Sequence, residues 1–114
     1  FLIGDGYHSY LETQGYVVRL HHGHGVKYQG GVGGITIPLN KAIAQWNKAK
    51  RADLDVMGHW HSFIDGGNFI VNGSLIGYSA YSIRIKADLQ KPKQAFFLLD
   101  RKRGKTIVCP IMFV

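Results

Sequence analysis

The sequence has 114 residues, of which 46% are hydrophobic and 18% charged, so it can form a core and is not a disordered chain. This length fits one domain, which we take to span residues 1–114. The single cysteine, Cys109, excludes an intramolecular disulfide and a cysteine-rich zinc module, and its apolar neighbours indicate a buried residue. The formal net charge of +7 favours anionic partners such as nucleic acid or phosphate esters, although the basic residues are scattered.

No apolar run approaches the roughly 20 residues that cross a bilayer, so we expect no membrane partner. The scarcity of cysteine suits a reducing compartment, and we expect a cytoplasmic protein.

The first predicted element is a short strand of β-branched and aromatic residues at 16–20, which runs into a histidine-rich segment and then a glycine-rich loop at 30–34. From Pro38 the spacing of apolar residues becomes helical, and it predicts one amphipathic helix over about 38–51. Its expected core face consists of Leu39, Ala42, Ile43, Trp46 and Ala49.

Further strands are predicted at 53–57, 69–72 and 82–86, and residues 94–100 and 106–113 flank a hairpin turn. The order of elements predicts an α+β fold that is mainly β-sheet, or one half of a layered sandwich.

The six histidines are unevenly distributed, and five of them form two clusters. His21, His22 and His24 follow the first strand, while His59 and His61 follow the strand at 53–57. Neutral imidazole is a common ligand of divalent transition metals, and strand ends are frequent positions for sites. Spacing alone leaves two interpretations open, a metal site and a structural or surface role for these histidines.

The segments Leu20-His21-His22-Gly23-His24 and Gly58-His59-Trp60-His61 resemble, in order, the last two of the five motifs of calcineurin-like metallophosphoesterases. Asn72-Gly73-Ser74-Leu75 resembles a segment that often follows the fifth motif. The sequence from the glycine-rich loop through residue 78 resembles that of phage and prophage members. The resemblance covers most of the chain from Tyr16 onward and implies the C-terminal half of an αββα sandwich.

The resemblance implies metal-binding roles for three histidines and subsidiary roles for two other residues. His22 and His59 would bind the second metal of a dinuclear centre and His61 the first, while His24 and Asn72 are second-shell or substrate-side candidates. His21 receives no role, and His8, which has no counterpart in the family, is expected at the surface.

The sequence departs from the family pattern because it has no Asp-x-His and no Gly-Asn-His. The bridging carboxylate, the first metal's Asp and His, and the general-acid His are therefore expected upstream of Phe1, and we assign no catalytic residue within the chain. The complete enzyme would hold two divalent ions, with Mn²⁺ preferred over Zn²⁺, Fe²⁺ or Ni²⁺, whereas this chain alone is expected to bind few or none.

The resemblance implies a metal-dependent phosphoesterase that acts on phosphodiesters or phosphomonoesters, with this chain as a C-terminal portion that is inactive alone. Removal of the other half would expose apolar surface, so we also expect a homo-oligomer. Two other classes stay open: a non-catalytic nucleic-acid-binding module, and a phage structural or assembly protein with incidental histidines.

Overall fold

The computed structural model describes residues 2–3, 6–23, 25–26, 34–76 and 91–113. Within these ranges the fold is α+β, mostly sheet with one helix, as the sequence predicts. The elements are β1 (Leu2–Ile3), β2 (Ser9–Thr13), β3 (Tyr16–His21), α1 (Thr36–Ala49), β4 (Leu54–Met57), β5 (Ile64–Asp65), β6 (Phe69–Val71), β7 (Lys93–Asp100) and β8 (Gly104–Met112).

Six of the strands form one mixed sheet in the order β1-β2-β3-β4-β6-β5. Strands β3, β4 and β6 in its centre run parallel, and the pairs toward both edges are antiparallel. The crossover from β3 to the parallel strand β4 contains α1, as parallel strand connections usually do. The carboxyl ends of β3, β4 and β6 therefore meet at one edge of the sheet.

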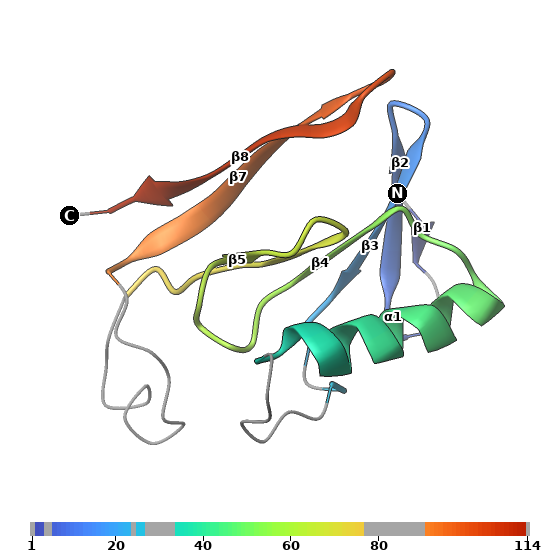
Figure 1. The fold of residues 1–114 in the computed structure, drawn as a ribbon, viewed down its shortest axis with the longest axis horizontal. Helices are drawn as coiled ribbons and strands as arrows, with labels where there is room; N and C mark the ends of the chain where they lie inside the picture. Colours follow the sequence, from blue (N-terminus) through green and yellow to red (C-terminus); the bar gives the residue numbers. More distant parts are fainter. Residues whose placement is uncertain (1, 4–5, 24, 27–33, 77–90, 114) are drawn as a thin grey trace.

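The molecule has three layers, with α1 on one face of the large sheet and the β7–β8 hairpin on the other (Figure 1). On the helix side, Leu39 and Ile43 of α1 pack with Met57, Phe69 and Val71 of the sheet. On the hairpin side, the core is made by Val18, Leu54 and Ile70 of the sheet with Ala95, Phe97, Leu99 and Val108 of the hairpin. Alternate residues of each central strand thus supply two separate cores.

Helix α1 begins two residues before Pro38 and ends at Ala49, slightly earlier than expected at both ends. Pro38 lies in the first turn, where its missing N–H leaves no helical hydrogen bond unmade. Leu39 and Ile43 are fully buried and Ala42 and Trp46 partly buried, but Ala49, expected on the core face, is exposed because the helix ends there. No helix in the described part of the chain is long and apolar enough to span a membrane.

The strands predicted at 16–20, 53–57, 69–72, 94–100 and 106–113 are present with bounds shifted by one or two residues. The strand predicted at 82–86 and residues 30–33 of the glycine-rich loop lie outside the described residues. Strands β1, β2 and β5 were not predicted. A tight turn at Gln14 and Gly15, both with positive φ (52° and 79°), joins β2 to β3.

Two expectations about burial are wrong. His8 is buried, with 5% of its surface exposed, because its ring packs edge-on against the indole of Trp46 at 4.5 Å between ring centroids. Cys109 is only half-buried, because it pairs with the exposed Phe96 on the side of the hairpin that faces away from the sheet.

Candidate functional site

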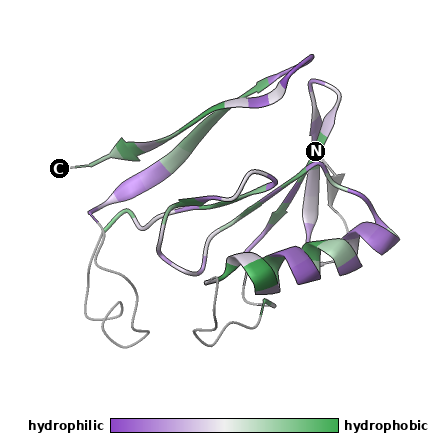
Figure 2. Ribbon diagram, in the orientation of Figure 1, coloured by the Kyte–Doolittle hydropathy of each residue, from purple (hydrophilic) through white to green (hydrophobic). Residues whose placement is uncertain are grey.

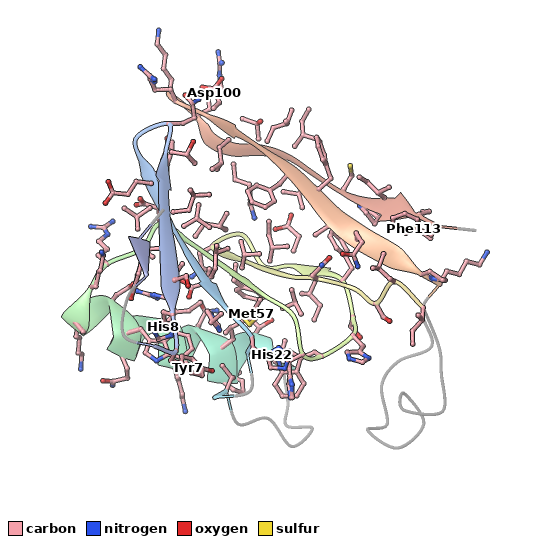
Figure 3. The ribbon with its side chains drawn as sticks, turned by 180° about the vertical axis from the view of Figure 1, so that it is seen from behind. Tyr7, His8, His22, Met57, Asp100 and Phe113 are labelled. Carbon is pink, nitrogen blue, oxygen red and sulfur yellow. The ribbon has the colours of Figure 1, made fainter. Side chains whose placement is uncertain are left out.

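The candidate site lies at the carboxyl ends of the parallel strands β3, β4 and β6. His21, the last residue of β3, is in register with Met57, the last residue of β4, so His22 and Gly58 leave the sheet side by side. The Gly58 N–H donates to the carbonyl of His22 at 3.2 Å, which ties the two segments together just beyond the sheet. Parallel sheets commonly place their sites at this edge. Figure 3 shows His22 there, next to Met57.

The structure brings His22 and His59 into contact. Nε2 of His22 lies 3.1 Å from Nδ1 of His59, and the two rings meet edge to face with centroids 4.9 Å apart. His22 is exposed and His59 half-buried, so the pair faces solvent on one side.

This separation fits two ligands of a single metal ion. With metal–nitrogen bonds of roughly 2.0–2.1 Å, two nitrogens 3.1 Å apart would make a nitrogen–metal–nitrogen angle of about 95–100°. This angle lies between the ligand–metal–ligand angles of octahedral and tetrahedral sites. Two neutral imidazoles supply no negative charge, however, and no group of three or more His, Cys, Asp or Glu side chains among the described residues could complete the site. The described residues therefore contain a pair of imidazoles with the spacing of metal ligands but no complete metal site.

The backbone that carries His59 is strained. His59 has φ of 70°, and the Trp60 N–H donates to the Gly58 carbonyl at 2.8 Å, so residues 58–60 form a γ-turn of the rare kind with positive φ. His61 also has positive φ, 57°. Such conformations cost about 1–3 kcal/mol each and persist where the surrounding structure imposes them, often at functional sites.

Gly23 and Trp60 impose that arrangement from two sides. Gly23 has φ of 102°, and a Cβ at this position would lie 3.3 Å from the Gly58 carbonyl oxygen and 3.5 Å from Cβ of His59. The indole of Trp60 packs against the helix-side core and meets the His59 ring edge-on, with centroids 4.8 Å apart. Trp60 thus serves as packing beneath the histidine pair.

A buried polar network lies behind His22, between the sheet and α1. Nη1 of Arg19 donates to both carboxylate oxygens of Asp55 at 3.2 Å, and Nε2 of His21 lies 3.2 Å from Oδ2. Arg19 and Asp55 are 0% and 1% exposed, and the Nη2 of Arg19 donates to Oδ1 of Asn47 and the carbonyl of Lys50. The network joins β3, β4 and the end of α1, and it already engages the carboxylate of Asp55.

The remaining predicted site residues are placed as follows. His61, two residues after His59, is half-buried, and the described residues contain no three-ligand group that includes it. His24 lies outside the described residues. Oδ1 of Asn72 accepts the N–H of Ala95 at 2.7 Å, and its amide donates to Gln94 at 2.8 Å, so the side chain joins the end of β6 to β7. The roles of His61, His24 and Asn72 toward metal or substrate stay predictions.

Comparison with known proteins finds similarity in structure alone. No family model matches the sequence, and no curated protein matches it either. Among solved structures, the chain is similar to wild-type Vps29 of Entamoeba histolytica complexed with Zn²⁺, with 19% identity, a TM-score of 0.59, and coverage of 97% of this chain and 67% of that one. A single mutant of the same Vps29 matches with 20% identity and a TM-score of 0.57 over 94% of this chain and 61% of that one.

The chain has the calcineurin-like metallophosphoesterase fold. A double mutant of the same Vps29 gives a third match, with a TM-score of 0.58 and 18% identity, over 95% of this chain and 61% of that one. The chain thus spans about two thirds, or slightly less, of the length of the Vps29 structures that it matches. One of these neighbours was crystallised with Zn²⁺, so divalent metal binding occurs within this fold.

Two features of the site were missed from the sequence. The buried network had a readable signal, since Arg19 and Asp55 are charged residues inside apolar strands and alternation places both on the helix side. The strained backbone at His59 had no signal in the sequence, because histidine rarely adopts positive φ and the neighbouring residue types do not indicate this conformation.

Proposed function

We propose that this chain is the C-terminal part of a metal-dependent phosphoesterase, and that His22 and His59 are ligands of one of its divalent ions. The observation that supports this most directly is the contact between Nε2 of His22 and Nδ1 of His59 at the carboxyl ends of neighbouring parallel strands. His61 is proposed as a ligand of a second ion, and the phage or prophage type is proposed on the sequence resemblance. Mn²⁺ is the preferred ion and Zn²⁺ the alternative.

The proposed substrate is a phosphodiester or phosphomonoester. A divalent ion held at this site would polarise a phosphoryl oxygen as a Lewis acid. The protein's part is to fix the directions of the two imidazoles, through the hydrogen bond from Gly58 to the His22 carbonyl and the packing of Trp60 against His59. The exposed side of His22 leaves room for a phosphate group to approach.

The proposed enzyme also needs carboxylate ligands. Asp55 lies nearby in the network, but its oxygens are engaged by Arg19 and His21. We therefore propose that the carboxylates and the general acid come from residues outside this chain, and that this chain alone binds metal weakly and turns over little substrate.

The test is metal binding to the full 114-residue chain, measured by titration calorimetry with Zn²⁺ and by Mn²⁺-induced broadening of the histidine ring signals in NMR spectra. Mn²⁺ should broaden the signals of His22 and His59 first. His22→Ala and His59→Ala should each lower the affinity for Zn²⁺ by about 100-fold or more, because each removes one of two ligands.

The control is Lys48→Ala, an exposed position on α1 away from the site, which should bind Zn²⁺ as the wild type does. Unchanged Zn²⁺ affinity in His59→Ala, with the fold intact by circular dichroism, would contradict the assignment. A preparation extended upstream should hydrolyse bis(4-nitrophenyl) phosphate with added Mn²⁺, and His59→Ala should lower that rate by several orders of magnitude.

A non-catalytic nucleic-acid-binding role is the alternative that one observation favours. Arg101, Lys102 and Arg103 are all exposed at the tip of the β7–β8 hairpin, where they could contact phosphates. This role would be supported over the enzymatic one by an affinity for single-stranded DNA that falls steeply as the salt concentration rises. The affinity should also be independent of divalent metal and unchanged in His59→Ala.

A further inference from the structure

Three aromatic rings pack around the imidazole of His21 at the end of β3, directly before the proposed ligand His22. The indole of Trp46 meets the imidazole edge-on with centroids 4.8 Å apart, and the His8 ring does so at 5.3 Å. The phenol ring of Tyr7 stacks on it at 5.9 Å, with 26° between the two planes. Trp46 comes from α1, along which hydrophobic and hydrophilic residues alternate (Figure 2). The side chain of His21 is consequently 0% exposed.

Tyr7 reaches this position because β2 runs antiparallel to β3. Ser9 pairs with Leu20, so the residues just before β2 lie next to those that follow β3. Figure 3 shows Tyr7 and His8 at the same end of the sheet as His22. Tyr7 and His8 precede the part of the chain that resembles the metallophosphoesterases, so the resemblance gives them no role.

The hydroxyl of Tyr7 holds the segment that follows His22. It accepts the N–H of Gly25 at 2.6 Å, which joins residues 18 positions apart in the sequence. A Cβ at Gly25 would overlap the phenol oxygen, so a side chain there would displace Tyr7. On the other side, the Gly58 N–H donates to the His22 carbonyl at 3.2 Å. The segment is thus held from the β2 side and from the β4 side.

Fixing this segment has a chemical consequence for a metal site that uses the His22 and His59 imidazoles. The His22 side chain is exposed, so the backbone on either side of it largely sets the direction of its ring. Ligands that are already oriented lose less side-chain entropy when a metal binds. Contacts behind the ligands typically change metal affinity by about 10–100-fold.

We propose that Tyr7 is a positioning residue of the His22–His59 pair, and that its hydroxyl acts through the N–H of Gly25. The metal-binding part of this role rests on the proposed function, whereas the contact between the two imidazoles can be measured without metal. Packing around His21 needs only the ring of Tyr7, which phenylalanine keeps. Positioning needs the hydroxyl, so Tyr7→Phe separates the two roles.

Tyr16→Phe is the matched control for Tyr7→Phe. Both tyrosines are half-buried, and the hydroxyl of Tyr16 also bonds to the backbone, donating to the Arg101 carbonyl at 3.4 Å. Tyr16 begins β3, so it lies at the opposite end of this strand from the histidine pair. Circular dichroism and urea unfolding should show that both variants keep the fold and have similar unfolding midpoints.

The first measurement is NMR spectroscopy of the metal-free chain. Tyr7→Phe should speed the amide exchange of Gly25 by about tenfold or more, because its N–H loses the phenol oxygen. The same variant should weaken the cross-peaks between the rings of His22 and His59, and Tyr16→Phe should leave both observations unchanged. Unchanged exchange at Gly25 or unchanged ring cross-peaks in Tyr7→Phe would overturn the positioning role.

The second measurement is calorimetric titration with Zn²⁺. Tyr7→Phe should lower the affinity by about tenfold or more, and Tyr16→Phe should bind as the wild type does. Gly25→Ala should reproduce the loss because it displaces the hydroxyl, and the double variant Tyr7→Phe/Gly25→Ala should lose less than the sum of the two.

Equal affinities of Tyr7→Phe and Tyr16→Phe for Zn²⁺ would overturn the role of Tyr7 in metal binding. Strictly additive losses in the double variant would overturn its action through Gly25. A wild type that binds no Zn²⁺ would contradict the proposed function instead, and the NMR comparison then decides by itself whether Tyr7 orients His22.

Discussion

At the scale of single residues, the candidate site depends on backbone conformations that side chains normally avoid. His59 and His61 have positive φ, and so does Gly23, with φ of 102°. Glycine is favoured at position 23, because a Cβ there would lie 3.3 Å from the Gly58 carbonyl oxygen in a backbone conformation that L side chains rarely adopt. The approach of His22 to His59 thus follows from one small residue as much as from the two imidazoles.

Gly23→Ala should therefore separate the two histidines. The added Cβ would lie 3.3 Å from the Gly58 oxygen in a conformation that alanine rarely adopts, so the segment must shift. We expect the Zn²⁺ affinity to fall about tenfold or more and the free energy of unfolding to fall by about 1–3 kcal/mol. The measurements are calorimetric titration and urea unfolding.

Gly15→Ala is the matched control, since Gly15 also has positive φ, 79°, but has nothing within 4 Å of the added Cβ. It should lose similar stability and keep the wild-type affinity for Zn²⁺. Equal losses of metal affinity in both variants would show that Gly23 acts through general stability alone.

At the scale of elements, the sequence predicts the helix and strands whose hydrophobic pattern extends over several residues. Leu39 and Ile43 at helical spacing revealed α1, and the apolar runs revealed β3, β4 and both strands of the hairpin. Strand β2 was missed because Tyr10 is its only buried residue, and β5 was missed because two residues are too few to show an alternating hydrophobic pattern.

The meeting of His22 and His59 was predictable, since both follow parallel strands. Their strained backbone was not, because tertiary contacts impose it.

The Arg19–Asp55 pair is a buried polar connection between β3 and β4 on the helix side, beside the contact of His21 with Asp55. Arg19→Met should lower the free energy of unfolding by about 3–5 kcal/mol, because it leaves the carboxylate of Asp55 buried without its guanidinium partner. The double variant Arg19→Met/Asp55→Asn should be more stable than the single one, since it removes the isolated charge. Urea unfolding of the wild type, both single variants and the double variant measures this coupling. Additive losses would mean that the two side chains act independently.

At the scale of the whole molecule, an ion pair at the surface joins the two sheets. Lys105 of β8 donates to Oδ1 of Asp65 on β5, and this hydrogen bond holds the pKa of Asp65 below its usual value of 3.8. A lowered folded-state pKa stabilises the protein above the unfolded-state value, and that stabilisation is lost as the pH falls through the folded-state pKa. Because Asp65 is 40% exposed, the pair contributes less than about 1 kcal/mol.

Asp65→Asn should therefore be slightly less stable than the wild type near neutral pH, and the difference should disappear as the pH falls through the lowered folded-state pKa of Asp65. Thermal unfolding of both proteins across this range measures the effect. Lys105→Met should show the same pH dependence, since it removes the other member of the pair. A difference that persists unchanged into strong acid would assign the effect of Asp65→Asn to something other than its charge.

The crossover between β3 and β4 has a consequence for the order in which the chain folds. The β2–β3 and β7–β8 hairpins and α1 need only contacts between residues near in sequence, which form quickly. The pairing of β3 with β4 must first close the whole segment between His21 and Leu54, at a cost in chain entropy. We therefore expect His22 and His59 to be among the last residues to meet, so a partly folded chain with both hairpins formed would lack the proposed pair of metal ligands.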